Sequence, residues 1–86
     1  MKEEEERALR FVENNTEMKK VAGGSFTASL VSYGDNGPIN PPDKYLIDLG
    51  NVEDIVAIVM VDRSTTPATL HLACTAKRNF TWNCEQ

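Results

Sequence analysis

The sequence has little cysteine, histidine and tryptophan: its 86 residues include 2 cysteines, 1 histidine and 1 tryptophan. It also lacks a long hydrophobic run, because the longest covers only residues 55–61, far short of the roughly 20 apolar residues that span a bilayer. Basic residues number 9 against 13 acidic ones, and the net charge of −4 disfavours a nucleic-acid backbone or an anionic lipid surface as the main partner. We therefore expect no nucleic-acid partner, and membrane association only through an anchor absent from this chain.

The first residues do not resemble a secretory signal, which needs a positive start followed by an apolar stretch of about 7 to 15 residues. Here a run of glutamates, Glu3 to Glu6, follows the initial Met-Lys. A domain expressed without its leader or anchor would also begin with Met and a polar helix. The sequence leaves open whether such a segment was removed before residue 1.

The motifs of enzymes and of cofactor-binding proteins are missing as well. His71 is the single histidine, and no Cys-x-x-Cys pair accompanies it. No serine lies in the glycine-framed turn that exposes a nucleophile. The glycines at 23–24 precede a predicted strand, not a helix start that could hold phosphate. We expect no enzymatic activity, no cofactor and no metal site.

A chain of this length can build only one small core, so residues 1–86 are expected to form a single α+β domain. We interpret the glutamate run as the solvated start of a helix over residues 2–22, with Asn14-Asn15-Thr16 causing a kink near Asn15. Thr16 is the expected cap of a second, shorter helix, and the glycines at 23–24 end it. Apolar residues at three- and four-residue spacings form the helix face meant for burial: Ala8, Phe11, Val12, Met18 and Ala22.

About five strands are predicted after the helix. Residues 55–61 are mostly β-branched and bounded by charges, which is typical of a strand buried on both faces. Apolar and polar residues alternate in the remaining predicted strands, at residues 25–32, 44–49, 68–76 and 80–84. The connections are too short for crossover helices, so the sheet should be mostly antiparallel with the helix against one face.

Residues 34–43 hold three prolines and two glycines, which excludes a helix or a ladder strand. We predict a long surface loop there and consider it the best candidate for a contact surface, although its composition fits a turn-rich connector equally well. The candidate partner-binding residues are Tyr33, Asp35, Asn36, Pro38, Ile39, Asn40, Pro41 and Pro42.

The only two cysteines, Cys74 and Cys84, flank a predicted hairpin turn at residues 77–79. Alternation places Cys74 on the inward face of its strand together with Leu70, Leu72 and Ala76. A hairpin centred on residue 79 would bring the two cysteines opposite each other, within the separation that a disulfide needs. We favour a structural disulfide over two buried free thiols, and both over a redox or metal role.

One resemblance adds to this. The residues that carry it are Ala8-Leu9, Val12, Asn15, Met18 and Val21-Ala22-Gly23-Gly24, followed by strands and a closing strand with Trp82. They resemble the small domains of the Coa1/Tim21 type, which are membrane-anchored and place a helix ending in glycine before an antiparallel sheet. The resemblance implies an assembly or interaction factor for membrane complexes rather than an enzyme. The proline-rich loop and the cysteine pair depart from the mitochondrial members. A cystatin-like arrangement is the rival, but its inhibitor motif Gln-x-Val-x-Gly is absent.

The sequence thus favours a non-enzymatic extracytoplasmic domain, periplasmic or secreted or the soluble part of an anchored protein, that binds another protein or assists complex assembly. The alternative is a small acidic inhibitor, with a cystatin-like layout or of the phage type, that binds an enzyme or a nucleic-acid-binding protein. Free thiols at both cysteines would instead indicate a cytoplasmic protein. The sequence identifies neither the partner nor the oligomeric state.

We predict that Cys74 and Cys84 are disulfide-bonded in the native protein. Intact mass after alkylation under denaturing conditions, with and without reductant, tests this directly. Reduction should lower the free energy of unfolding by about 2 to 5 kcal/mol, because the bond restricts the unfolded chain. Two thiols that alkylate without reductant, in protein taken from its native compartment, would contradict both the disulfide and the extracytoplasmic location.

Overall fold

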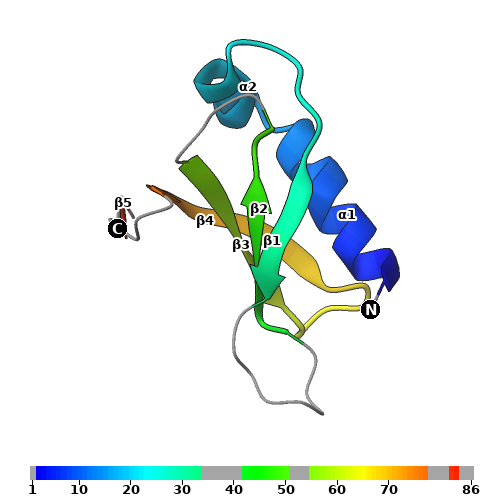
Figure 1. Ribbon diagram of the computed structural model, residues 1–86. Coiled ribbons are helices and arrows are strands. Elements are labelled where there is room, and N and C mark those ends of the chain that lie inside the picture. Colours follow the sequence, from blue (N-terminus) through cyan, green and yellow to red (C-terminus); the bar gives the residue numbers. More distant parts are fainter. Residues whose placement is uncertain (1, 34–41, 51–54, 78–81, 84–86) are drawn as a thin grey trace.

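A computed structural model describes residues 2–33, 42–50, 55–77 and 82–83 of the chain. Two helices precede a sheet of antiparallel strands, so the predicted α+β class is confirmed (Figure 1). The elements in chain order are α1 (Lys2–Glu13), α2 (Thr16–Ala22), β1 (Ser29–Tyr33), β2 (Lys44–Asp48), β3 (Ile55–Asp62), β4 (Thr69–Lys77) and β5 (Trp82–Asn83).

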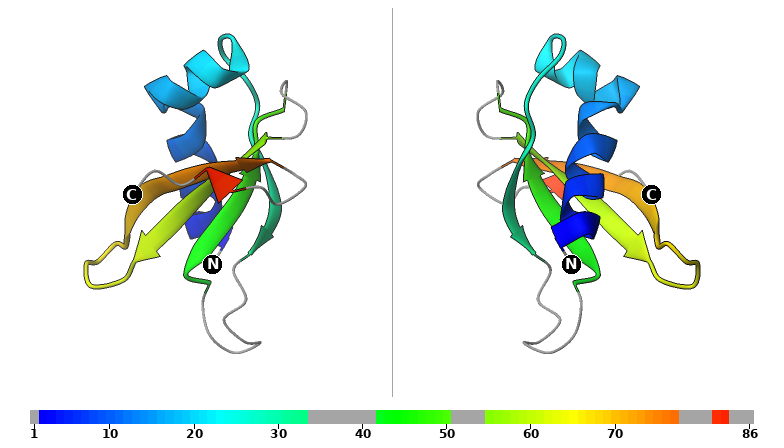
Figure 2. Two further views of the ribbon diagram at one scale, coloured as in Figure 1. Left: turned by 90° about the vertical axis from the view of Figure 1, so that its left-hand side faces the viewer. Right: turned by 90° about the vertical axis from the view of Figure 1, so that its right-hand side faces the viewer.

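The strands follow one another across the sheet in sequence order, each antiparallel to its neighbour. Strands β1 to β4 make up the body of the sheet, and β5 adds only two residues that pair with the end of β4. The helix α1 lies against one face of the sheet (Figure 2). This arrangement is the layered packing expected when strands are joined without crossover helices.

The break between the helices confirms the predicted kink but corrects its cap. Asn15, not Thr16, is the capping residue: its backbone is extended (φ −74°, ψ 127°) and its side-chain oxygen accepts a hydrogen bond from the Met18 N–H at 3.0 Å. Thr16 is the first residue of α2. An asparagine side chain in this position satisfies an amide that the new helix leaves without a partner. The predicted glycine stop is confirmed, since Gly23 ends α2 in the left-handed conformation (φ 80°).

The first strand is shorter than predicted. We expected strand over residues 25–32, whereas β1 begins at Ser29. The amide of Ala28 donates to the Glu13 carboxylate at 2.8 Å, so this part of the backbone bonds to the end of α1 instead of a neighbouring strand. The apolar side chains of Phe26 and Ala28 still pack on the core, which explains why the sequence alternates before the strand starts.

The core lies between α1 and the sheet. Alternate residues of β2 and the residue after it, Tyr45, Ile47 and Leu49, are completely buried there and share one face of the strand. Residues 56–59 of β3 are buried on both faces, because Val59 joins the helix-side core while Ile58 belongs to a second cluster and is only 4% exposed. Met60 is 37% exposed, so the predicted two-sided burial holds for the middle of the run and not for its end. The place of β3 between β2 and β4 confirms that residues 55–61 form the centre of the sheet.

The pairing of β4 with β3 is interrupted by a bulge. Leu72 pairs with Val59, but Cys74 pairs with Ile58, the preceding residue of β3. One extra residue of β4 therefore lies between these two pairs, and the register shifts there. The sequence alternates without interruption through this region and gives no sign of the bulge.

Glycine at position 50 is required by both its backbone and its surroundings. Gly50 has φ +70°, and a Cβ there would lie 2.6 Å from the backbone oxygen of Thr27. Gly23 has a similar φ of +80°, with nothing within 4 Å of the place where a Cβ would be. Comparing an alanine substitution at the two positions therefore distinguishes the cost of backbone strain, which both share, from that of the steric conflict, which only position 50 has.

We predict that Gly50→Ala destabilises the domain more than Gly23→Ala. The control should lose about 1 to 2 kcal/mol for its left-handed backbone, and Gly50→Ala should lose about 1 to 3 kcal/mol more through the contact with Thr27. Urea unfolding followed by circular dichroism measures both. Equal losses would show that the close approach of residues 27 and 50 does not constrain the fold.

Candidate functional site

The described structure covers only part of the predicted binding loop. Tyr33 is the last residue of β1 and Pro42 lies just before β2. Asp35, Asn36, Pro38, Ile39, Asn40 and Pro41 fall outside the described residues, and so does Cys84. Cys74 is described only through its backbone pairing in β4, so the disulfide stays a prediction. What the structure shows is how the end of this loop is held.

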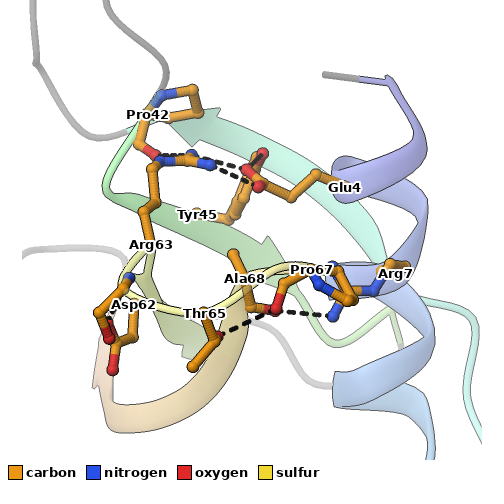
Figure 3. Close-up of polar contacts among 10 residues, drawn as sticks. Glu4, Arg7, Pro42, Tyr45, Asp62, Arg63, Thr65, Pro67 and Ala68 are labelled. Carbon is orange, nitrogen blue, oxygen red and sulfur yellow. Dashed lines mark hydrogen bonds and ion pairs between the residues drawn. The ribbon is translucent and has the colours of Figure 1, made fainter.

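A bidentate ion pair between Arg63 and Glu4 holds the end of the loop at Pro42. The Arg63 guanidinium donates from Nη1 to Glu4 Oε2 at 2.6 Å and from Nη2 to Glu4 Oε1 at 2.7 Å, and Nη2 also donates to the carbonyl oxygen of Pro42 (Figure 3). The Tyr45 hydroxyl donates to Glu4 Oε1 at 2.6 Å. We call these four residues, Glu4, Pro42, Tyr45 and Arg63, the loop-base clasp. It joins α1, β2 and the residue after β3 to the end of the loop.

The local structure explains why these side chains meet. Glu4 lies in the first turn of α1, four residues before the buried Ala8, and so falls on the helix face that packs against the sheet. Tyr45 is completely buried under that face, and a buried phenol needs a hydrogen-bond partner for its hydroxyl. Arg63 follows β3 directly and reaches Glu4 from the other side.

The clasp changes the acid–base properties of its members. The Glu4 side chain is 13% exposed and that of Arg63 is 35% exposed. The hydrogen bond from Arg63 is the main reason that the pKa of Glu4 lies below its ordinary value; burial opposes this, and the Tyr45 hydroxyl adds to it. The same hydrogen bond raises the pKa of Arg63. Both side chains are therefore charged at neutral pH.

At the end of the loop, the backbone carbonyls of Pro42 and Asp43 both accept hydrogen bonds. The Pro42 oxygen accepts from Arg63, and the Asp43 oxygen accepts from the Val61 amide at 2.9 Å. At the other end of the loop, Tyr33 pairs with Tyr45 across the β1–β2 ladder. Tyr33, the last described residue before the loop, therefore pairs with Tyr45, which follows Pro42 and Asp43 closely in the chain.

A second connection, over residues 62–68, lies beside the clasp (Figure 3). Asp62 Oδ1 accepts from the Ser64 amide at 2.9 Å and from the Ser64 hydroxyl at 2.7 Å, and these bonds lower the pKa of Asp62. Arg7 of α1 donates to the Ala68 carbonyl at 2.8 Å, which ties the helix to this turn. The turn includes a cis peptide bond between Thr66 and Pro67.

A hollow of about 350 Å³ opens between the start of α1 and this turn. Its charged lining is balanced, with two glutamates and two arginines, and one of each sign is already committed to the clasp. In the described residues, no group of three or more His, Cys, Asp or Glu side chains is arranged to hold a metal ion. The lining residues are Glu3, Glu4, Arg7, Arg63, Thr65, Thr66, Pro67 and Ala68.

Sequence reasoning missed both charged members of the clasp. We interpreted Glu4 as part of a solvated run and Arg63 as part of a polar connection. The position of Glu4 four residues before Ala8 was the available signal, because this spacing continues the apolar face of the helix. Nothing near Arg63 in the sequence indicates its partner, which lies 59 residues away.

Comparison with known proteins gives no relative: no protein-family model matches the chain, and no curated protein or solved structure shows significant similarity to it. The resemblance to Coa1/Tim21-type domains therefore stays a prediction. Within the described ranges, no helix is both long and apolar enough to cross a membrane.

We predict that Glu4→Gln destabilises the domain by about 1 kcal/mol at neutral pH, since it removes the charge that Arg63 and Tyr45 bind in a partly exposed site. Glu6→Gln is the matched control on the same helix, because the pair between Glu6 and Arg10 is about half exposed on both sides. The control should change stability by less than about 0.5 kcal/mol. Thermal unfolding at pH 7 compares the two.

The same pair of variants tests the pH dependence. The folded-state pKa of Glu4 lies below its ordinary value of 4.5, so its contribution is complete above that pH and is lost as the pH falls through the folded-state pKa. The gap in melting temperature between wild type and Glu4→Gln should close as the pH drops below 4.5. A gap that is constant down to pH values at which all carboxylates are protonated would refute the charged role of Glu4.

Proposed function

We propose that this chain is a non-enzymatic protein-interaction or complex-assembly domain whose contact surface lies at the clasp end of the sheet. That surface consists of the loop at residues 34–43 and the neighbouring turn at 62–68. The observation that carries the proposal is the loop-base clasp, which holds Pro42 through Arg63 and Glu4. A long loop with a fixed base is a common form of recognition surface on a rigid scaffold.

The clasp supports binding through preorganisation. A partner that binds a loop must offset the entropy lost when the loop and its flanking residues are ordered. Here the flanking residues are already held by the ladder at Tyr33 and by backbone carbonyls at residues 42 and 43. The three prolines of the loop restrict its backbone further. Both features lower the cost of binding at this end of the domain.

We also propose an extracytoplasmic location, as a periplasmic or secreted protein or as the soluble part of an anchored one. The support is the placing of the only two cysteines on either side of one predicted turn in a small domain, where a disulfide would contribute a large part of the stability. The partner is another protein in that compartment.

We predict that a single loop substitution abolishes partner binding. Immobilised wild-type domain, Ile39→Asp and the control Val21→Asp are compared for the proteins they retain from an extract of the native compartment, and the retained protein is then purified and titrated against each. Val21 is 42% exposed on α2, at the end of the molecule away from the turn at 62–68 (Figure 1). Wild type and Val21→Asp should bind alike, and Ile39→Asp should not.

Two outcomes would contradict the proposal. Equal binding by Ile39→Asp and wild type would place the contact surface elsewhere, and catalytic turnover by the purified domain would exclude a purely binding role. The salt dependence of partner binding distinguishes this proposal from the alternative of an acidic inhibitor. Such an inhibitor, with a net charge of −4, would lose affinity for its target steeply as the salt concentration rises.

A further inference from the structure

The strand β1 forms one margin of the sheet (Figures 1 and 2). In the described part of the chain, β2 is the only strand that pairs with it, whereas the last strand of the sheet body, β4, is paired on one side with β3 and at its end with β5. An edge strand presents backbone N–H and C=O groups that the strand of another chain can bond.

Natural proteins guard edge strands with charged residues, proline, short length or a bulge. Strand β1 is 5 residues long and contains neither a charged residue nor proline, in a chain that is 26% charged. Val31 at its centre is 45% exposed. The pairing of β1 with β2 shifts register between Leu30 and Ser32, which places Val31 at a bulge.

We propose that two copies of the chain associate through β1, antiparallel and about a two-fold axis at Val31, to form one continuous sheet. In a two-fold contact residue i of one copy meets residue j of the other, and the residue on the axis meets its own copy, so a charge at the axis would face a like charge. A strand without charges is suited to this pairing even though each chain carries a net charge of −4. The axis places Val31 against its copy and Ser29 in register with Tyr33 of the second copy.

The helices leave room for this contact. Helix α1 packs on the face of the sheet and not beyond the outer edge of β1 (Figure 2). The dimer uses the outer edge of β1, of which only Tyr33 is also a candidate partner-binding residue, so the dimer goes beyond the proposed function. The two can fail independently, since the dimer is tested with the purified chain alone.

Sedimentation equilibrium over a wide concentration range tests the dimer, with non-reducing electrophoresis to exclude disulfide-linked chains. The wild type should show a reversible monomer–dimer equilibrium. Val31→Lys should weaken it on the order of tenfold by placing two like charges in contact. Val21→Lys is the matched control, because Val21 on α2 is similarly exposed at 42%, and it should dimerise as the wild type does.

A wild type that is monomeric at every concentration overturns the proposal, and so does a dimer that both lysine variants weaken equally. Amide hydrogen exchange of the wild type provides a readout that does not depend on the variants folding. Exchange at residues 29–33 should slow as the dimer forms. A dimer that forms without slowing exchange in β1 uses another surface and also overturns the proposal.

Discussion

The ion pair between Glu4 and Arg63 is the interaction on which the arrangement of the clasp end depends. It joins the first turn of α1 to the residue after the central strand, across 59 positions of sequence, by two charge-assisted hydrogen bonds of 2.6 and 2.7 Å. The same carboxylate satisfies the hydroxyl of the buried Tyr45, and the same guanidinium holds the carbonyl of Pro42. One pair therefore fixes the start of the helix, the end of β3 and the base of the loop.

A partly exposed pair contributes little stability alone, so its geometry must rest on the core beneath it. Val12 of α1, Ile47 of β2 and Val59 of β3 are completely buried between helix and sheet. Burying a side chain of this size contributes about 1.5 to 3 kcal/mol, which exceeds the roughly 1 kcal/mol expected for the pair. The core fixes the distance between α1 and the sheet, and at this distance the side chains of Glu4 and Arg63 meet at the clasp end.

Local patterns in the sequence predicted much of the fold. The alternation through Tyr45 and Ile47 and the apolar run of β3 identify their buried faces, because these depend only on neighbouring residues. The bulge between Ile58 and Val59 was missed because it depends on how two strands pair, which alternation within one strand does not record. The clasp was missed for the same reason: Glu4 looks like one of several exposed glutamates until the fold brings Arg63 beside it. Long-range pairing is the part of the structure that a single sequence conveys least.

A double-mutant cycle on Glu4 and Arg63 tests the central claim most directly. The free energy of unfolding is measured in urea for the wild type, Glu4→Gln, Arg63→Gln and the double variant. The coupling energy is the difference between the loss in the double variant and the sum of the two single losses. The clasp predicts that the second substitution costs little once the first is made, with a coupling of at least about 0.5 kcal/mol. Losses that add within error would show that the two residues act independently, and the loop base would then depend on other contacts.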